Sequence, residues 1–566
     1  MKKYIIGLTM MSALSMGLTS CSDFLDEPIR GQQDMSNYFT TEEECAKQIT
    51  GCYNLLDCRG WWQIYKFYNL CNITTDDCWM GNTTQDPGEY RVACMFTGNT
   101  LELGTACQNF WQYRYKGITQ CNIAIDKIQQ IQFKDEKYKK RLIAEAKFLR
   151  GFYYLDLVKN FGGVPIMLSL KMPSEVQGVE RASKEETYAQ IEQDLKEAIP
   201  DLPTRAEQEA SQVGHATSGA AKGFLAKAYL YEGKYEEAEK ILQELCCRGS
   251  YAGQTPEYKL MDDFGKVWNI DYNNNEESLF EIQTLDDTQY DLGEHYSVVV
   301  GSRDDSGWAW GLPTSDLENA FKNAGDNIRL KYTILHDGQT DVPGDPTWNE
   351  DNPYVISASK HKSGRCNMKL FIPVGKRPSP YDAVHNPLNI RLLRYAEVLL
   401  MYAEVENQLG HDSEAQWALN EVRGRVHLSP ITSTGKDLRD AIRTERRLEL
   451  ALEGTRLDDL RRWKMDDGKT MMEHVFGPNG TFVKYNMETS TDPYETTNQL
   501  ENSNEGINFQ APRDLLFAIP NSEITMSNGS IKQNPGYNSQ FSTFNSQLST
   551  LNSQINLSIN YIQGSA

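Results

Sequence analysis

Residues 217–246 read TSGAAKGFLAKAYLYEGKYEEAEKILQELC, and this stretch decides the fold class. Its first half carries bulky and small residues at helical spacing, a glycine follows, and a second helical pattern has a small residue on its apolar face. The positions concerned are Leu225, Ala226, Tyr229, Gly233, Tyr235 and Ala238. A glycine between two helical patterns favours a tight turn. The stretch therefore predicts a helix hairpin.

The spacing within this hairpin is typical of a tetratricopeptide-type unit. A weaker copy follows at Ala403, Gly410 and Ala415. Such units bury their apolar faces against neighbouring hairpins, so a scaffold of stacked helices is expected. Long helical patterns at 41–56, 105–131 and 136–161 support a mostly α fold.

The segments between these helical patterns have a different composition. Residues 57–103 and 247–385 are rich in Gly, Asn and Asp, and the second segment contains short strand-like runs such as Ser278–Ile282. A charged helix is expected from Leu438 to Trp463, with its apolar positions at helical spacing. The prediction is a helical scaffold with a large loop-rich region and a few short strands.

Composition excludes two broad classes of function. The 566 residues contain 57 Lys and Arg against 78 Asp and Glu, a formal charge of −21. Because a nucleic acid would be repelled by such a surface, no nucleic-acid partner is expected. The mean hydropathy of −0.57, with no long apolar run after the N-terminus, excludes a polytopic membrane protein.

The N-terminus predicts export and a lipid anchor. Lys2 and Lys3 precede an apolar stretch from Tyr4 to Leu18, the layout of a signal peptide over residues 1–20. Leu18-Thr19-Ser20-Cys21 resembles a bacterial lipobox, in which Cys21 becomes the lipidated first residue. Residues 21–40 form a linker, and its early carboxylates resemble the acidic signal that sends lipoproteins of some Gram-negative bacteria to the outer face of the outer membrane. The alternatives are a periplasmic location and an ordinary signal peptide.

The sequence contains an unusual cluster of cysteines. Of the twelve, Cys21 is assigned to the lipid, and eight of the remaining eleven lie between Cys45 and Cys121. An exported location permits disulfides, but buried free thiols are an equal alternative. No CxxC pair occurs and the eight histidines are scattered, so neither a metal site nor a cofactor is expected.

Five separate motifs, in order along the chain, resemble those of the SusD/RagB family of outer-membrane lipoproteins. They lie at 21–28, at 145–154 continuing to 161–165, at 394–404, at 445–463, and at 519–523 with 533–537. The resemblance implies one SusD-like domain over 41–537, with an N-terminal part at 41–246 and a loop-rich and C-terminal part at 247–537. Residues 538–566 extend beyond the family pattern as a low-complexity tail.

The resemblance also implies a function. Members hold a glycan, or in the RagB branch a peptide, above the pore of a SusC-type TonB-dependent transporter, and they are not enzymes. A cell-surface, lipid-anchored protein that captures oligosaccharide and delivers it to such a transporter is therefore expected, with oligopeptide import as the alternative.

Two loops offer the aromatic and polar side chains that suit sugars. One is Asp76–Asn82 with Arg91, and the other is Arg303–Trp310. The prediction is an exposed platform made of Trp79 and one of Trp308 or Trp310. Asp77, Asn82 and Arg91 would then bond the sugar hydroxyls. The alternative is that these tryptophans belong to the core, and at least one ring of Trp308 and Trp310 is expected to face inward.

A glycoside hydrolase is the rival class, because such enzymes use two positioned carboxylates. Asp76-Asp77 and Asp304-Asp305 are acid pairs of the right type. Adjacent acids in an extended loop usually point apart, however, and no GxSxG, HExxH or intact phosphate-binding loop occurs. The sequence therefore favours binding over catalysis.

Overall fold

The computed structural model describes residues 39–56, 64–80, 88–97, 104–171, 173–286, 289, 292–357, 363–382, 385–482 and 507–537. The predicted signal peptide, Cys21, most of the linker and the tail from 538 lie outside the described residues. In the described part, no helix combines the length and the apolarity that a membrane span requires.

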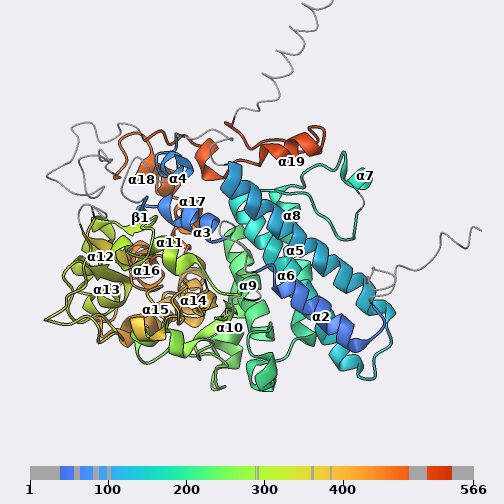
Figure 1. Ribbon diagram of the computed structural model, residues 1–566, viewed down its shortest axis with the longest axis horizontal. Coiled ribbons are helices and arrows are strands. Elements are labelled where there is room, and N and C mark those ends of the chain that lie inside the picture. Colours follow the sequence, from blue (N-terminus) through green and yellow to red (C-terminus); the bar gives the residue numbers. More distant parts are fainter. Residues whose placement is uncertain are drawn as a thin grey trace, which may run out of the picture.

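Nine helices form a frame that runs across the molecule (Figure 1). They are α2 (Glu42–Tyr53), α5 (Gly104–Gln130), α6 (Glu136–Phe161), α8 (Lys184–Ala198), α9 (Ser218–Glu232), α10 (Tyr235–Leu245), α14 (Tyr395–Leu409), α15 (Asp412–Arg425) and α16 (Gly435–Glu449). From α5 to α15, each helix packs on the next, and α14 also packs on α16. The predicted helical scaffold is confirmed.

The two predicted hairpins are α9–α10 and α14–α15. Gly233 and Gly410 end the first helix of each pair in the left-handed conformation, with φ of 76° and 80°. The small residues Ala238 and Ala415 are fully buried where the second helix crosses its neighbour. Glycine tolerates positive φ without a Cβ clash, so the turn expected from the sequence is formed.

Local signals also set the ends of several other helices. The side chain of Thr41 accepts a hydrogen bond from the backbone amide of Glu44, and the Glu44 carboxylate accepts one from the backbone amide of Thr41. The helix α2 therefore begins with a capping box. Asp135 caps α6, and Gly162 ends it at the residue expected from the sequence.

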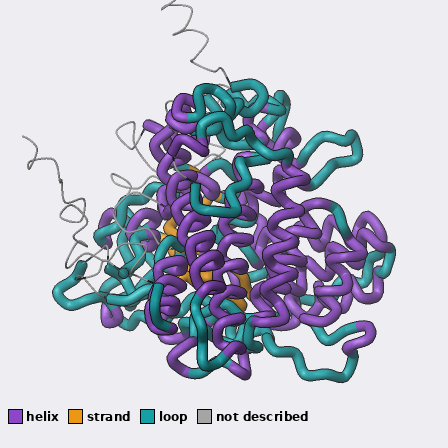
Figure 2. Tube along the Cα trace, turned by 90° about the vertical axis from the view of Figure 1, so that its right-hand side faces the viewer, coloured by secondary structure: helices purple, strands orange, loops and turns teal. Residues whose placement is uncertain are grey.

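The elements outside the frame, from residues 64–94 and 278–476, cover one end of it and are here called the loop-rich part. Its helices are α3 (Ile64–Ile73), α4 (Gly88–Cys94), α11 (Tyr296–Val300), α12 (Ser315–Ala324), α13 (Asn327–Thr333), α17 (Arg456–Arg462) and α18 (Met471–Phe476), while α7 (Pro173–Val176) and α19 (Asn521–Met526) are short outlying turns. Its strands are β1 (Cys78–Trp79), β2 (Ser278–Ile282), β3 (Leu312–Pro313), β4 (Ile334–His336), β5 (Arg365–Asn367) and β6 (Ile390–Arg394). Figure 2 shows the strands as short pieces among helices and loops.

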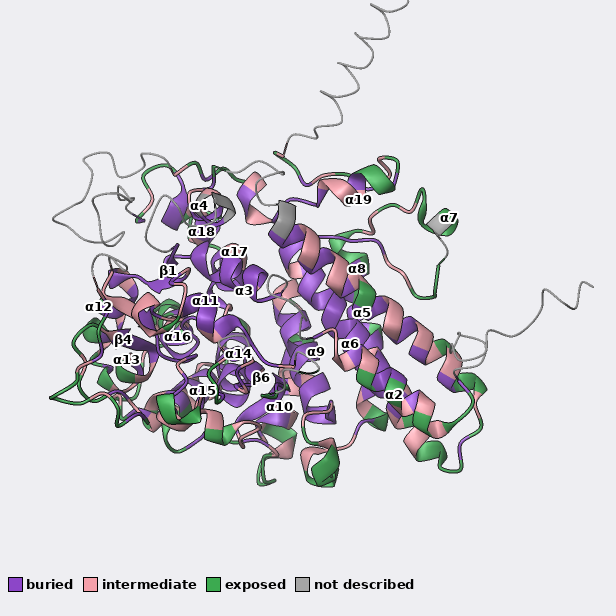
Figure 3. Ribbon diagram, in the orientation of Figure 1, coloured by how far each residue is buried: buried purple, intermediate pink, exposed green. Residues whose placement is uncertain are grey.

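The strands form three antiparallel pairs, β1–β3, β2–β6 and β4–β5. The predicted strand at 278–282 is β2, and all five of its residues are buried. In Figure 3 the outer helices carry alternating buried and exposed stripes, whereas α9 and α14 are buried along most of their length. The main core therefore lies between the frame and the loop-rich part.

Three expectations about local structure were wrong. The 57–103 segment contains α3 and α4, and 247–385 contains α12 and α13. All but one residue of α3 are buried, so the helix lacks the one-sided periodicity that reveals an amphipathic helix. The helix expected at 438–463 is interrupted between α16 and α17, where Leu452 and Gly454 have φ of 65° and 83°.

The ten cysteines in the described ranges are free thiols, and all but Cys247 are buried. Burial raises the pKa of most of them, for example that of Cys71 to about 12. Of the two alternatives that the sequence left open, disulfides and buried free thiols, the structure shows buried free thiols for these residues.

Candidate functional site

The two loops singled out in the sequence meet through β1 and β3. Trp79 pairs with Leu312, and Cys78 pairs with Pro313. Beyond the strands, Thr314 donates from its backbone to the Asp77 carbonyl at 3.0 Å and from its hydroxyl to the Asp76 carbonyl at 2.7 Å. Segments more than two hundred residues apart are thus held side by side, as the predicted platform requires.

Trp308 and Trp310 lie next to each other at the start of this pairing. Their ring centroids are 4.7 Å apart with the planes tilted by 46°, and both residues are partly exposed while they also pack against the main core. Ala309, between them, is fully buried and has a positive φ of 57°. This backbone turn, rather than an extended strand, brings the two rings together.

The backbone of the Trp308–Trp310 segment is firmly held. The amides of Trp308 and Trp310 donate to the carbonyls of Val298 and Val299 in α11, at 2.8 and 2.9 Å. The Asn69 side chain on α3 donates to the Trp310 carbonyl at 2.9 Å. At Gly311 a Cβ atom would lie 2.5 Å from the Asn69 side chain, so only glycine allows this approach. A rigid backbone thus presents the two rings.

Trp79 does not occupy the exposed position that was predicted for it. Only 7% of its surface is exposed, and its ring lies 5.4 Å from that of Phe482. Asp77 is 1% exposed. Both therefore belong to the packed interior beneath the site. For Trp79 this is the alternative that the sequence left open, whereas burial of Asp77 was not expected. Asn82 lies outside the described residues, and so does the side chain of Arg91, whose backbone belongs to α4.

The acids Asp76 and Asp77 are bound by two arginines from the C-terminal part of the chain. Arg456 makes two bonds of 2.8 Å to Asp76, and Arg447 bonds Asp77 at 2.6 Å and Asp316 at 2.5 Å. Burial alone would raise the pKa of Asp76, but Arg447 and Arg456 outweigh it and hold that pKa well below its usual range. Both carboxylates are thus held in buried ion pairs, and the pair anchors the loop.

The second acid pair is engaged in the same way. Asp305 forms a two-pronged pair with Arg377, at 2.6 Å for both bonds, and Asp304 accepts from the backbone and the hydroxyl of Ser357 at 2.7 and 2.9 Å. Neither pair offers the two free carboxylates of a hydrolase.

A small cleft lies beside the Trp308 segment. Its volume is about 30 Å³, and Gly307, Asp305, Arg377 and Tyr381 line it. Tyr381 is 42% exposed, and the Arg377 guanidinium lies 5.6 Å from its ring centre. The sequence analysis missed Tyr381. An aromatic residue next to Pro380, within a Gly- and Pro-rich segment, was the signal available for it.

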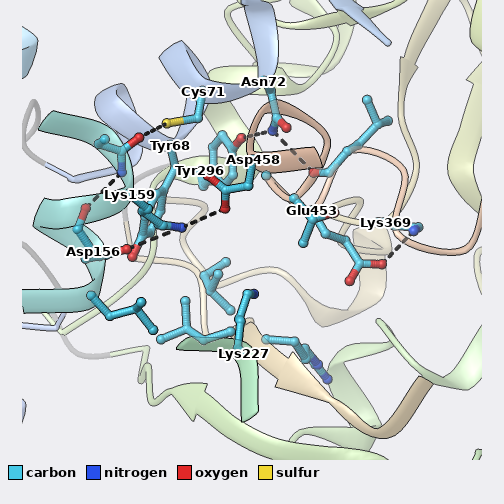
Figure 4. Close-up of a pocket in the computed structure, with 18 of the residues that line it drawn as sticks. Tyr68, Cys71, Asn72, Asp156, Lys159, Lys227, Tyr296, Lys369, Glu453 and Asp458 are labelled. Atoms are coloured by element: carbon cyan, nitrogen blue, oxygen red, sulfur yellow. Dashed lines mark hydrogen bonds and ion pairs between the residues drawn. The ribbon is translucent and has the colours of Figure 1, made fainter. Parts of the chain in front are cut away.

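A separate cavity of about 80 Å³, with a mainly apolar lining, lies in the interior between α3, α6, α9 and α17 (Figure 4). Its charged groups are paired. Lys159 lies 3.3 Å from Asp458 and 3.5 Å from Asp156, and Lys369 lies 2.6 Å from Glu453. Burial would lower the pKa of Lys159, but the two acids outweigh it and raise that pKa. The Lys159–Asp458 pair joins α6 of the frame to α17.

One group of side chains in the described ranges has the spacing of cation ligands. His411 Nδ1 lies 2.7 Å from Glu406 and 3.5 Å from Glu239, and the three ligand atoms fall within 4.8 Å. The group joins α10 to the α14–α15 hairpin and takes no residue from the two loops. A hydrogen-bonded His–Glu pair accounts for it without a metal.

Two family models match the chain. Residues 276–537 match the model described as the SusD family, and residues 23–230 match a SusD-like model described as starch-binding associating with outer membrane. Among curated relatives, SusD-like protein P2 of Formosa agariphila is 25% identical, covering 94% of this chain and 100% of the relative. A SusD-like protein of Bacteroides ovatus is 26% identical, covering 81% of this chain and 82% of the relative.

Solved structures agree with this assignment. A laminarin binding SusD-like protein superposes with a TM-score of 0.71 at 27% identity, covering 88% of this chain and 100% of that one. Surface glycan-binding protein A from Bacteroides thetaiotaomicron, in complex with laminarihexaose, shares the fold with a TM-score of 0.67 at 20% identity, covering 88% and 100%. The matches of both parts of the sequence and the similarity of the whole fold therefore agree. The chain belongs to the SusD/RagB family of outer-membrane-associated, non-catalytic binding proteins.

Proposed function

We propose that this protein captures an oligosaccharide on the face formed by Trp308, Trp310 and Tyr381. The observation that carries the proposal is the pair of partly exposed tryptophan rings, 4.7 Å apart, on a backbone tied to α11 and α3. One face of a pyranose carries only C–H groups, which pack on flat aromatic rings. A platform held in place before binding loses little side-chain entropy on contact.

Polar groups flank the rings. Arg303 donates from Nε to the Trp308 carbonyl at 2.9 Å, and Arg377 lies between Asp305 and the Tyr381 ring. Guanidinium and hydroxyl groups at the edge of an aromatic platform suit the hydroxyls of a sugar. Asn82 and Arg91 remain candidates for the same role.

A glycan is favoured over a peptide. The similarity to a laminarin binding SusD-like protein, at 27% identity over 88% of this chain, supports this choice. Import of oligopeptides, as in the RagB branch, is the second candidate, and the same experiment tests it.

The test is calorimetry with purified protein and three probes: laminarihexaose, a panel of other neutral oligosaccharides, and a mixture of short peptides. Binding of at least one oligosaccharide and of no peptide is expected, with no new reducing ends after prolonged incubation. Binding of peptides alone would favour the RagB-like function, and release of reducing sugar would favour a hydrolase.

The glycan would then be delivered to a SusC-like TonB-dependent transporter, with Cys21 as the lipid anchor on the outer face of the outer membrane. Family membership and the lipobox support this proposal. We expect the protein to co-purify with the transporter in mild detergent. We also expect protease to cleave it on intact cells, and the Cys21→Ala variant to be released from membranes. Recovery of the monomer alone would contradict the partnership with the transporter. Protection from protease would contradict the location on the outer face of the membrane.

A further inference from the structure

A cleft of about 320 Å³ lies outside the sugar platform. Its lining comes from the segment 263–272, from Tyr332 of α13, and from the segments 343–344 and 368–373. None of the three platform residues lines it. A volume of this size is within the range of small-molecule sites in proteins, which combine aromatic surface with a few polar groups. The cleft is therefore large enough to bind a small ligand.

Aromatic side chains line the cleft from its interior to its rim. Two are buried, two are half-buried and one is exposed; in that order they are Phe264 and Trp268, Phe371 and Tyr332, and Tyr272. The exposed fraction of Tyr272 is 37%. Flat aromatic rings pack against the C–H face of a pyranose, as proposed for the platform. The cleft therefore offers a sugar several aromatic surfaces at once.

Polar side chains share the lining with these rings. All four come from the segment 263–272, and they are Asp263, Lys266, Asn269 and Asp271. Carboxylate, ammonium and amide groups together supply both the acceptors and the donors that the hydroxyls of a sugar need. The combination of aromatic surface and mixed polar groups is therefore the one that suits a saccharide.

The charges around the cleft are balanced. Lys266 lies in the lining, with its Nζ 5.4 Å from the ring centre of Tyr272, and Asp271 pairs with Lys376 at 2.8 Å. The two acids of the lining are thus accompanied by two lysines. A charged ligand would gain little here, because attraction to one sign is offset by repulsion from the other. The cleft therefore favours a neutral ligand.

Local contacts fix the walls of the cleft. The Asp263 carboxylate accepts a hydrogen bond from the Gly265 amide at 2.8 Å. The side-chain oxygen of Asn269 accepts one from the Asp271 amide, also at 2.8 Å. A Cβ atom at Gly265 would overlap the ring of Tyr332, so only glycine lets α13 pack this closely. A cleft that is formed before binding loses little entropy when a ligand enters.

We propose that this cleft is a second binding site for the sugar units of a neutral oligosaccharide. Tyr272 packs on the C–H face of one unit, and the side chains of Asp263, Asn269 and Lys266 bond its hydroxyls. Phe371 lines both this cleft and the small cleft beside the platform, so the second site is a neighbour of the platform. The choice of ligand class rests on the proposed function, whereas the place of the site rests on the cleft alone.

The test uses the Trp308→Ala/Trp310→Ala variant, in which the platform is removed. Saturation-transfer NMR titrations measure its dissociation constants for glucose, galactose, mannose, xylose, maltose, cellobiose and laminaribiose. At least one of these sugars should bind. Adding Tyr272→Ala should weaken that binding by at least about tenfold, because the stacking ring is lost. Adding Tyr272→Phe should leave the binding unchanged, since the ring is kept.

Tyr251→Ala is the matched control. Tyr251, like Tyr272, is the last residue of a short helical turn, but it does not line the cleft. Its replacement should leave sugar binding unchanged. Lys266→Ala is the second variant, to be used should Tyr272→Ala melt early, and it should also weaken binding, because it removes a donor to the sugar hydroxyls.

Two results would overturn the second site: none of the sugars binds the variant that lacks the platform, or Tyr272→Ala and Lys266→Ala both leave its binding unchanged. The outcome also separates this proposal from the platform. Sugar binding by the parent that disappears entirely in the Trp308→Ala/Trp310→Ala variant would overturn the second site and leave the platform standing. Sugar binding that only Tyr272→Ala removes would support the second site and overturn the platform.

Discussion

Trp79 and the Trp308–Trp310 pair lie on neighbouring segments joined by β1 and β3, yet their surroundings differ. Trp79 is covered by Phe482 and lies next to the Asp76 and Asp77 ion pairs, whereas the other two rings keep part of their surface exposed. Both segments have the same Gly-, Asp- and Asn-rich composition. The difference shows that loop composition alone does not expose an aromatic ring, because a distant part of the chain can cover it.

The largest expected effect comes from the ion pairs beneath Trp79. Asp76→Ala leaves Arg456 buried without its two bonds, and loss of one partner from a buried pair costs about 3–5 kcal/mol. Urea unfolding measures this cost. Asp271→Ala is the control: its pair with Lys376 is also short, at 2.8 Å, but about half exposed, so it should cost less than about 1 kcal/mol. Equal effects of the two changes would contradict a structural role for Asp76.

Trp79→Ala should lower the free energy of unfolding by a similar or slightly smaller amount, about 3–5 kcal/mol, because it leaves a cavity against Phe482. Trp79→Phe should retain much of this stability. A Trp79→Ala protein that melts like the parent but no longer binds sugar would restore the platform first predicted from the sequence.

Trp308→Ala and Trp310→Ala should each destabilise the fold by less, about 1–2 kcal/mol, because their rings are only partly removed from water. Thermal unfolding of both variants beside Trp79→Ala tests the contrast. Should either variant lose as much stability as Trp79→Ala, that ring would belong to the core.

The smallest effect concerns acid pH. The folded-state pKa of Asp76 is lowered by Arg447 and Arg456 below its ordinary value of 3.8. Its contribution to stability is therefore complete above that ordinary value and is lost as the pH falls toward the lowered folded-state pKa. The Asp76→Asn variant should have a lower melting temperature than the parent protein at neutral pH. Below a pH of about 4, its melting temperature should fall less steeply with pH than that of the parent. Parallel curves for parent and variant would contradict this assignment.

The frame was more predictable than the site. Gly233, Gly410, Thr41 and Gly162 act through local rules of caps and turns, and these rules were enough to locate four helix ends. The helix α3 escaped prediction because all but one of its residues are buried, so it has no exposed face.

The candidate site depended on contacts that no local pattern contains. The two loops were recognised by their residue types, but their pairing through β1 and β3 joins positions more than two hundred residues apart. Burial of Trp79 depends on Phe482, and that of Asp77 on Arg447. The positive φ of Ala309, which brings the two partly exposed tryptophans together, is unusual for a residue with a Cβ.

The most direct test of the central claim is a calorimetric titration of the Trp308→Ala/Trp310→Ala double variant, beside the parent and Trp79→Phe, with an oligosaccharide that the parent binds. Loss of the rings should weaken binding by at least ten- to a hundredfold, about 1.4–2.8 kcal/mol, while Trp79→Phe binds as the parent does. Parent-like affinity in a folded double variant would contradict the claim that Trp308 and Trp310 form the sugar platform.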